Sequence, residues 1–242
     1  MSDDGARIRP LVARGVLDAG LAAHVSILLD AGVPLTLVSP VGNLTTIVAD
    51  AFASSLRING TRSDSDVIDV ASDHGFEWLA DPVGIGCLDP RAGTAVRPSG
   101  AMLLRIRQLF DGLDPQVART ALRALSRGHR AIVEARSIDL ASLFDALRAS
   151  PVRLPEDDLH QLGVVLQFDA TSLVAGHLLH PTTGSSRRAL TLLVTRDAGS
   201  GAWDDFAWAA LPHFAERSRL SQQQYDRVHR ARTVLLEGSA GS

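Results

Sequence analysis

The 242-residue sequence contains no lysine, and its 24 Lys+Arg positions are all arginine. Chemistry that depends on a compact ammonium group therefore cannot come from this chain, because a guanidinium is not an equivalent substitute. The single cysteine, Cys87, excludes an internal disulfide and a cysteine-based zinc cluster. Apolar runs are short, as in Gly163–Leu166, and none approaches the roughly 18 residues of a membrane span. The first ten residues lack the apolar segment of a signal peptide, so we expect a cytoplasmic protein.

Composition and charge are those of a folded globular protein. Hydrophobic residues make up 45% of the chain and charged residues 21%, which excludes a largely disordered chain. The formal net charge is −3 and the sequence pI is about 6.2. This balance does not favour a nucleic-acid partner. We also expect no direct insertion into a membrane.

The first two thirds of the chain predict alternating helices and strands. Apolar spacing indicates helices over Leu11–Gly32, with a break near Gly15–Asp18 and Asp18 as an N-cap, and over Thr45–Leu56. Between them, Val33–Val38 predicts a strand buried on both faces, because its apolar residues do not alternate with polar ones. The remaining predicted elements are strands at Val67–Val70 and Ala131–Ala135, helices at Pro115–Gly128 and Asp139–Ala149, a loop at Asp81–Gly100, and an ambiguous segment at Met102–Phe110. This alternation is typical of an α/β layer fold.

After Pro151 the pattern changes. Three β-type runs follow without helices between them, at Leu162–Phe168, Ser172–His180 and Ala189–Arg196. A turn sequence at Asp197–Gly201 precedes a further run at Ala202–Ala209, which together predict an antiparallel meander. Ser221 and Gln224 match a capping box at the start of a last helix. We therefore divide the chain into a lead-in (1–10), an α/β core (11–150), a β-rich part with the last helix (151–237) and a flexible tail (238–242).

The turn at residues 39–43 joins the first strand to a helix, which is the architecture of a phosphate cradle. The P-loop version requires G-x-x-x-x-G-K-[ST]. With Thr46 at the final hydroxyl position, Thr45 replaces the lysine, while Leu44 and Ser39 replace the two glycines. Gly42 stands where many P-loops carry an additional glycine. Taken alone, this segment fits an ordinary strand-to-helix turn better than a P-loop.

Two longer segments carry a family resemblance. Gly15–Phe52 (GVLDAGLAAHVSILLDAGVPLTLVSPVGNLTTIVADAF) and Ala118–Leu147 (ARTALRALSRGHRAIVEARSIDLASLFDAL) together cover about a third of the chain. The first resembles the entry to the ATPase core of type II and type IV secretion and pilus-assembly motors. The second resembles the segment of that family that contains its histidine box, with Gly128 and His129 matching without gaps. Their order and spacing agree with the family.

The resemblance assigns site residues and also exposes departures from the family. The phosphate-binding positions fall on a set of five residues: Ser39, Gly42, Asn43, Thr45 and Thr46. The histidine-box His falls on Arg136, which could face a phosphate or pair on the surface with Asp139 or another neighbour. The acidic box falls near Val67–Glu77, with Asp69 as the best candidate, and the Gly-Glu pair of the Walker B strand falls near Asp111–Gly112. Neither the P-loop lysine nor the Walker B glutamate is in place, so the resemblance implies poor or absent ATP hydrolysis.

The resemblance implies a RecA-like P-loop-type core with a mostly parallel sheet, followed by a small antiparallel β-rich part. As a function it implies a catalytically degenerate ATPase homologue that is an assembly or regulatory subunit, with a protein partner such as an intact motor ATPase or another secretion or pilus component. Two alternatives stay open: a weak ATP-hydrolysing motor subunit, and an interaction module with a vestigial anion-binding loop. The expected ligands are ATP with Mg²⁺, bound weakly, or a lone phosphate or sulfate, or none. The oligomeric state stays open, although without a competent nucleotide site we expect a monomer or small oligomer.

Other constellations have simpler explanations. His177 and His180 could ligate a metal, but residues three apart on a strand face opposite sides, and we predict no metal site. Arg187–Arg188 is more typical of a solvated pair than of an interaction surface. Four aromatic residues near the end of the meander predict a small core rather than a binding face: Trp203, Phe206, Trp208 and Phe214. The sequence has no G-x-S-x-G elbow and no G-x-G-x-x-G in a strand-loop-helix context.

Overall fold

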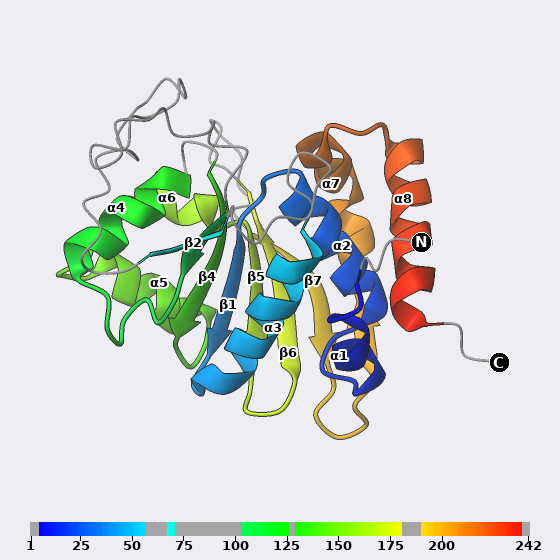
Figure 1. Cartoon of the computed structure of the whole chain (residues 1–242), viewed down its shortest axis with the longest axis horizontal. Helices are drawn as coiled ribbons and strands as arrows, with labels where there is room; N and C mark the ends of the chain where they lie inside the picture. Colours follow the sequence, from blue (N-terminus) through cyan, green and yellow to red (C-terminus); the bar gives the residue numbers. More distant parts are fainter. Residues whose placement is uncertain (1–4, 57–66, 71–102, 126–128, 181–189, 239–242) are drawn as a thin grey trace.

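A single mixed sheet organises the molecule. The computed structural model describes residues 5–56, 67–70, 103–125, 129–180 and 190–238 (Figure 1). Its eight strands lie in the order β2-β3-β4-β1-β5-β6-β7-β8. Their bounds are β1 Leu35–Ser39, β2 Val67–Val70, β3 Leu103–Ile106, β4 Arg130–Arg136, β5 Val164–Phe168, β6 Leu173–Leu179, β7 Leu190–Arg196 and β8 Trp203–Asp205. The strands from β2 to β5 in this order are parallel, and β5 to β8 form an antiparallel meander.

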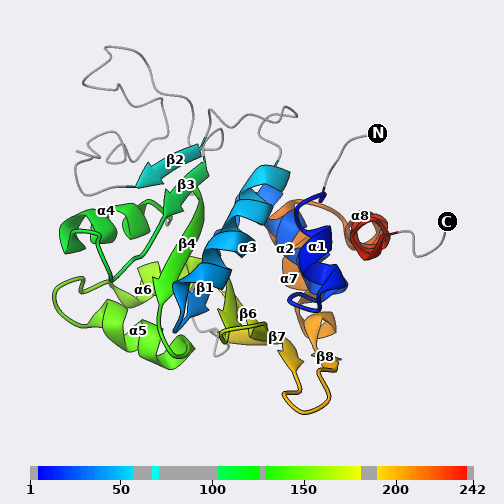
Figure 2. The same ribbon diagram turned by 60° about the horizontal axis from the view of Figure 1, so that its bottom comes forward.

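Helices cover the sheet on both faces (Figures 1 and 2). One face packs against α1 Arg9–Ala13, α2 Ala19–Asp30, α3 Gly42–Ser55, α7 Leu211–Ser218 and α8 Gln222–Glu237. The other face packs against α4 Pro115–Leu125, α5 Leu140–Arg148 and α6 Glu156–Leu159. Short 3₁₀ turns at η4 His160–Leu162 and η5 Ala207–Ala210 lead into β5 and α7. The two faces bury two separate apolar clusters, as the α/β prediction requires.

The first predicted strand is central and buried on both faces, as its composition indicates. β1 lies between β4 and β5, and all five of its residues are buried. Leu35 and Leu37 join the apolar cluster under α2 and α3, whereas Val38 joins the cluster under α4 and α5. A polar residue in the middle of the strand, Thr36, donates its hydroxyl to the carbonyl of Leu162 at 3.0 Å. Burial on both faces explains why the sequence does not alternate.

Several predicted boundaries hold and others shift. The strand at Val67–Val70, the N-cap at Asp18 and the capping box at Ser221 are confirmed. The ambiguous segment contains a strand, β3, and α3 begins at Gly42, three residues before the predicted Thr45. Residues 81–100 and 239–242 lie outside the described ranges.

From Gly5 onward, the residues expected to form a lead-in pack against the core. Ile8 is buried and belongs to the core, and α1 begins at Arg9. Gly5 has φ +98°, and a Cβ there would lie 2.7 Å from Leu236 of α8. The Nε of Arg9 donates to the carbonyl of Leu235 at 2.8 Å, which satisfies a carbonyl in the last turn of α8. These contacts dock the first helix against the last one, an arrangement that local sequence patterns cannot report.

A buried aromatic cluster joins α8 to α2. The Nδ1 of His24 lies 2.7 Å from the hydroxyl of Tyr225, and its ring stacks on His229 with a centroid distance of 3.7 Å. The Nε2 of His229 donates to the carbonyl of Gly20 at 3.0 Å, and Phe214 of α7 packs against His24. Burial, and secondly the neighbouring imidazole of His229, lower the pKa of His24 to about 3. His24 is therefore neutral in the folded protein at neutral pH.

This histidine should make the folded state acid-sensitive. In the unfolded chain His24 binds its proton near pH 6.5, whereas in the folded protein it does so only near pH 3. Between these values the unfolded state binds more protons, so the free energy of unfolding falls as pH falls, by about 2–3 kcal/mol between pH 6.5 and 4.5. We expect urea unfolding curves to show this loss in the natural protein and a shallower pH dependence in His24→Phe. An equal pH dependence in both proteins would contradict the assignment.

Candidate functional site

The connections of β1 and β4 leave the sheet in opposite directions. From β1 the chain passes through α3, on one face, toward β2, whereas from β4 it passes through α5 and α6, on the other face, to β5. β1 and β4 are neighbours in the sheet. In open α/β sheets the crevice outside the carboxyl ends of two such strands is the usual ligand position. The topology therefore points to the carboxyl edge between β1 and β4.

A polar cavity of about 340 Å³ lies at this edge. Its lining comes from the turn after β1 and the first turn of α3, from the segment after β3, and from the end of β4. The lining residues are Val41, Gly42, Asn43, Thr45, Thr46, Gln108, Asp111, Glu134, Ala135 and Arg136. The volume falls within the range of small-molecule sites, and the mixture of amide, hydroxyl and charged groups suits a polar ligand better than an apolar one.

The N-terminus of α3 opens onto the cavity without a side-chain cap. Its N-cap residue is Val41, whose side chain cannot accept a hydrogen bond from the first turn. The first-turn amides carry the positive end of the helix dipole. The Thr45 hydroxyl donates to the carbonyl of Gly42 at 2.7 Å, so it stabilises the first turn and is not free for a ligand. Because the helix starts at Gly42, the turn between strand and helix is too short to wrap around a phosphate as a glycine-rich loop would.

A buried ion network forms one wall of the site. Glu134 of β4 is 4% exposed, and its Oε1 accepts from Nε and Nη2 of Arg105 of β3 at 3.1 and 3.0 Å. Its other oxygen accepts from the Thr46 hydroxyl at 2.7 Å. The Nη1 of Arg105 pairs with Asp50, one turn further along α3. The network therefore connects β3, β4 and α3 through charged hydrogen bonds.

The guanidinium of Arg105 is firmly protonated. Burial alone would lower its pKa, but the hydrogen bond to Asp50 and the charge of Glu134 outweigh burial and raise it. The charged residues among the described lining are one cation, Arg136, and two anions, Asp111 and Glu134. Arg105 does not line the cavity but pairs with Glu134 from behind. Acidic and basic groups thus balance at the site, and no excess of positive charge is available to a polyanion.

The structure brings together most of the predicted phosphate-binding residues. Gly42, Asn43, Thr45 and Thr46 all line the cavity. Ser39 does not: its hydroxyl lies 3.3 Å from the Asp169 carbonyl and accepts from the amide of Val41 at 3.1 Å, so it shapes the turn.

The other two predicted site residues lie apart from each other. Arg136 lines the cavity but is 62% exposed, and it donates to the carbonyl of Pro40 and to Asp111 at 3.1 and 3.3 Å. Asp69 lies on β2, 56% exposed, where it pairs with Arg107 at 2.9 Å and does not line the cavity. Asp69, the best candidate for the acidic box, is therefore not part of the described site, and residues 71–77 of the expected range lie outside the described residues.

Three residues of the site were missed in the sequence. Arg105 and Glu134 each interrupt an apolar strand, in LLRI and in AIVEA, and opposite charges inside two buried strands are a signal of an internal ion pair. Gln108 lies two residues past β3 with φ +49°, an unusual conformation for a non-glycine residue, and it lines the cavity. Its position could not be assigned because the bounds of β3 were ambiguous in the sequence.

The remaining sequence candidates lie elsewhere. The Nε2 of His180 lies 2.8 Å from the Thr191 hydroxyl, and its ring packs on His213. In the described ranges no group of three or more His, Cys, Asp or Glu is arranged to hold a metal. Of the four aromatic residues expected to form a core, Phe214 is fully buried, whereas Trp208 is 69% exposed. Arg187–Arg188 and Cys87 lie outside the described residues.

Comparison with known proteins adds no relative. No protein-family model and no curated protein matches the sequence. Among the described helices, none has both the length and the hydropathy that crossing a bilayer requires.

Proposed function

We propose that this chain is a catalytically degenerate homologue of the secretion and pilus-assembly motor ATPases, with a RecA-like core, and that it is an assembly or regulatory subunit. Its partner would be an intact motor ATPase or another secretion or pilus component. The observation that carries the proposal is the cavity between β1 and β4, which lies where an α/β fold binds its ligand but presents a charge-balanced, lysine-free wall.

Charge supports the loss of nucleotide turnover. Phosphoryl transfer is catalysed by positioning and by cations that neutralise the transferred group. Thr45 stands where the lysine would be, and its hydroxyl is used within the first turn of α3. Thr46, the one P-loop residue retained, donates to Glu134, so its hydroxyl is occupied by an internal carboxylate. Among the described residues of this wall the positive charge is that of Arg105, and it is already paired with Glu134 and Asp50.

The bounds of β3 support a position for the Gly-Glu pair of the Walker B strand that differs from the one expected from the sequence alone. β3 is the strand that precedes α4, and it ends at Ile106. The residues that directly follow it are Arg107 and Gln108, so the Gly-Glu pair would fall there rather than at Asp111–Gly112. The neutral amide of Gln108 can donate and accept hydrogen bonds but cannot act as a carboxylate base or metal ligand of the same strength.

The two other functions make different predictions for the same site. A weak ATPase would need Arg136 to face the phosphates, yet that side chain is engaged by Pro40 and Asp111. An interaction module with a vestigial anion site would retain only the uncapped N-terminus of α3, which could hold a lone phosphate or sulfate.

Titration calorimetry with Mg²⁺·ATP, Mg²⁺·ADP and inorganic phosphate tests the proposal. We expect the natural chain to bind ATP with a dissociation constant weaker than about 1 mM. The double variant Leu44→Gly/Thr45→Lys, which introduces a glycine and a cation at the P-loop positions, should bind ATP more tightly. Leu44→Gly alone is the control for the loss of packing, because Leu44 contacts the core. Micromolar ATP binding by the natural chain would contradict the degenerate site. If the double variant binds ATP no more tightly than the natural chain, the loop is not a decayed P-loop, and the resemblance to the motor ATPases concerns the fold alone.

A further inference from the structure

Arg217, in the last turn of α7, is a half-buried arginine without a partner among the described residues. Its Nη1 is buried and makes no hydrogen bond, and no ion pair engages the guanidinium within the described ranges. Burial lowers the pKa of Arg217, and the charge of its exposed neighbour Glu216 opposes this effect. Taking a charged group out of water is costly unless an opposite charge and hydrogen bonds compensate it. An anion would provide both.

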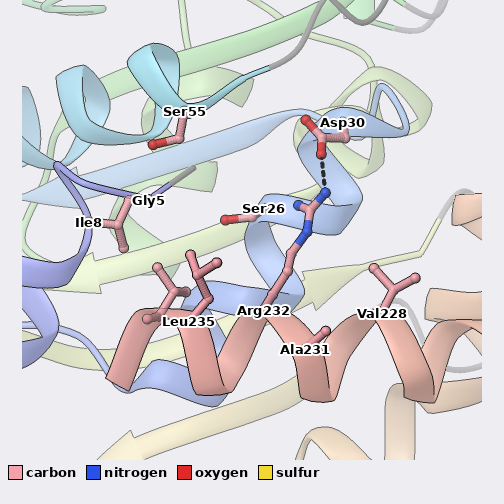
Figure 3. A pocket seen from close by; sticks show the side chains of 10 residues that line it. Gly5, Ile8, Ser26, Asp30, Ser55, Val228, Ala231, Arg232 and Leu235 are labelled. Carbon is pink, nitrogen blue, oxygen red and sulfur yellow. Dashed lines mark hydrogen bonds and ion pairs between the residues drawn. The ribbon is translucent and has the colours of Figure 1, made fainter. Parts of the chain in front are cut away.

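Three other arginines that are partly or fully buried have such compensation. Arg105 is paired with two carboxylates, and Arg130 donates to the backbone carbonyl of Asp30 at 2.7 Å. Arg232 lines an apolar cavity of about 250 Å³ beside α8, where its Nη2 pairs with Oδ2 of Asp30 at 2.5 Å (Figure 3). Compared with these three, Arg217 lacks a bonded acceptor in the described part of the chain.

Two imidazoles lie beside Arg217. His213 precedes it by four residues, so both side chains lie on one face of α7, and the tilt of helical side chains toward the N-terminus brings the guanidinium toward His213. The ring of His213 packs against that of His180, directly after β6, with a centroid distance of 4.3 Å. The Nε2 of His180 lies 2.8 Å from the hydroxyl of Thr191 of β7. His213 is exposed, so this group of three, which we call the α7 cluster, reaches the solvent.

No carboxylate is bonded to the α7 cluster within the described residues. Burial lowers the pKa of His180 to about 4, and the other two members of the cluster and His160 of η4 lower it further through their positive charge. The Nε2 of His160 lies 3.7 Å from Glu156, but that carboxylate is already bonded to Arg148 at 2.7 Å. The segment after His180, residues 181–189, contains no Asp or Glu. The surroundings of the cluster therefore favour an anion.

The α7 cluster lies at the opposite edge of the sheet from the cavity between β1 and β4. β5 runs parallel to β1, and β6 runs antiparallel to β5, so the end of β6 lies beside the start of β5. The cavity lies at the carboxyl edge of β1 and shares no lining residue with the cluster. An inference from the α7 cluster is therefore independent of the proposed function.

We propose that the α7 cluster binds a phosphate group, either free or carried by a small organic molecule. The guanidinium of Arg217 would pair with phosphate oxygens, and each imidazole would offer an N–H donor. Three side chains from separate positions match the several acceptor oxygens of a phosphate better than the two of a carboxylate. The anion also favours protonation of the imidazoles, so binding takes up protons.

Titration calorimetry with inorganic phosphate and with phenyl phosphate, at constant ionic strength, tests the proposal. We expect a dissociation constant below about 1 mM for the natural chain. Arg217→Met should weaken binding at least about tenfold, whereas Arg230→Met, an equal change of charge at an exposed position of α8, should change it less than about twofold. Phenyl phosphate that binds as tightly as phosphate would identify a phosphorylated organic ligand, and binding of inorganic phosphate alone would identify the free ion.

Thermal unfolding supplies a readout that does not depend on the identity of the ligand. Arg217→Met keeps the apolar stem of the side chain and removes the unpaired charge, so without phosphate it should unfold at no lower temperature than the natural chain. Phosphate at about 10 mM should raise the unfolding temperature of the natural chain and not that of the variant. Sulfate, which does not titrate in this range, should bind more tightly at about pH 6 than at about pH 8.

Four results would overturn the proposal. The first is no phosphate binding by the natural chain, and the second is equal binding by Arg217→Met. The third is a lower unfolding temperature for Arg217→Met without phosphate, which would show that the protein itself holds the guanidinium. The fourth is binding that Arg136→Met abolishes and Arg217→Met does not, which would place the ion in the cavity between β1 and β4.

Discussion

Replacing Arg105 with methionine is expected to destabilise the protein by about 3–5 kcal/mol, because it leaves Glu134 buried without its ion partner. Glu134 is 4% exposed and receives two hydrogen bonds from Arg105. Methionine fills a similar volume, so the loss of charge pairing rather than a void dominates the cost. The measurement is the free energy of unfolding in urea at neutral pH, compared with that of the natural chain.

Two comparisons isolate the buried pair. Arg107→Met, two residues along the chain, removes a solvent-exposed partner of Asp69 and should cost under about 1 kcal/mol. The double variant Arg105→Met/Glu134→Gln removes both charges and should be more stable than Arg105→Met alone, since no uncompensated carboxylate is left. A cost for Arg105→Met no greater than that for Arg107→Met would show that the network does not hold α3 against the sheet.

Gly163→Ala is expected to be the other severe change, at about 4 kcal/mol, and it acts through the backbone. Gly163 precedes β5 with φ +74° and ψ −119°, a region that residues with a Cβ avoid. An added Cβ would lie 2.2 Å from the carbonyl oxygen of Pro34, at the entry to β1. The same carbonyl accepts the amide of Val164 at 2.9 Å, so relief of the clash would disturb the pairing of β1 with β5.

Gly32→Ala separates the conformational strain from the clash. Gly32 also has a positive φ, +94°, but a Cβ there would meet no atom within 4 Å. We expect this variant to lose only about 1 kcal/mol in a thermal or urea unfolding experiment. Similar losses for the two variants would mean that the backbone around Pro34 adapts and that the close approach is not a constraint.

The parallel part of this fold can be predicted from local sequence patterns, because strands that are buried on both faces consist mainly of apolar residues. The sequence of β1, in which apolar and polar residues do not alternate, requires cover on both faces, and the structure provides it with α3 on one side and α5 on the other. The docking of Gly5–Ile8 against α8 leaves no such mark, since it joins segments more than 200 residues apart. The start of α3 was placed late because Gly42 and Asn43 are weak helix formers, although the end of β1 requires the chain to turn there.

The site was harder to predict than the fold. Patterns of Thr and Gly led to the turn after β1, and the cavity includes four of the five residues assigned there. The opposite wall depends on how β3 and β4 align: the register pairs Arg105 with Ile132, and the guanidinium reaches Glu134 two residues further along β4. A sequence gives charges but not the strand register that brings them together. Asp69 lies apart from the cavity because β2 is at the edge of the sheet, with β3 and β4 between it and β1.

We propose that the cavity between β1 and β4 lies where related ATPases bind nucleotide, but that it does not catalyse ATP hydrolysis. The most direct test is release of inorganic phosphate from Mg²⁺·ATP under excess protein, for the natural chain and for Thr46→Ala. The account predicts that neither protein exceeds the uncatalysed background, because the site has no lysine and the Thr46 hydroxyl is bound to Glu134. Turnover well above background in the natural chain that Thr46→Ala abolishes would contradict it.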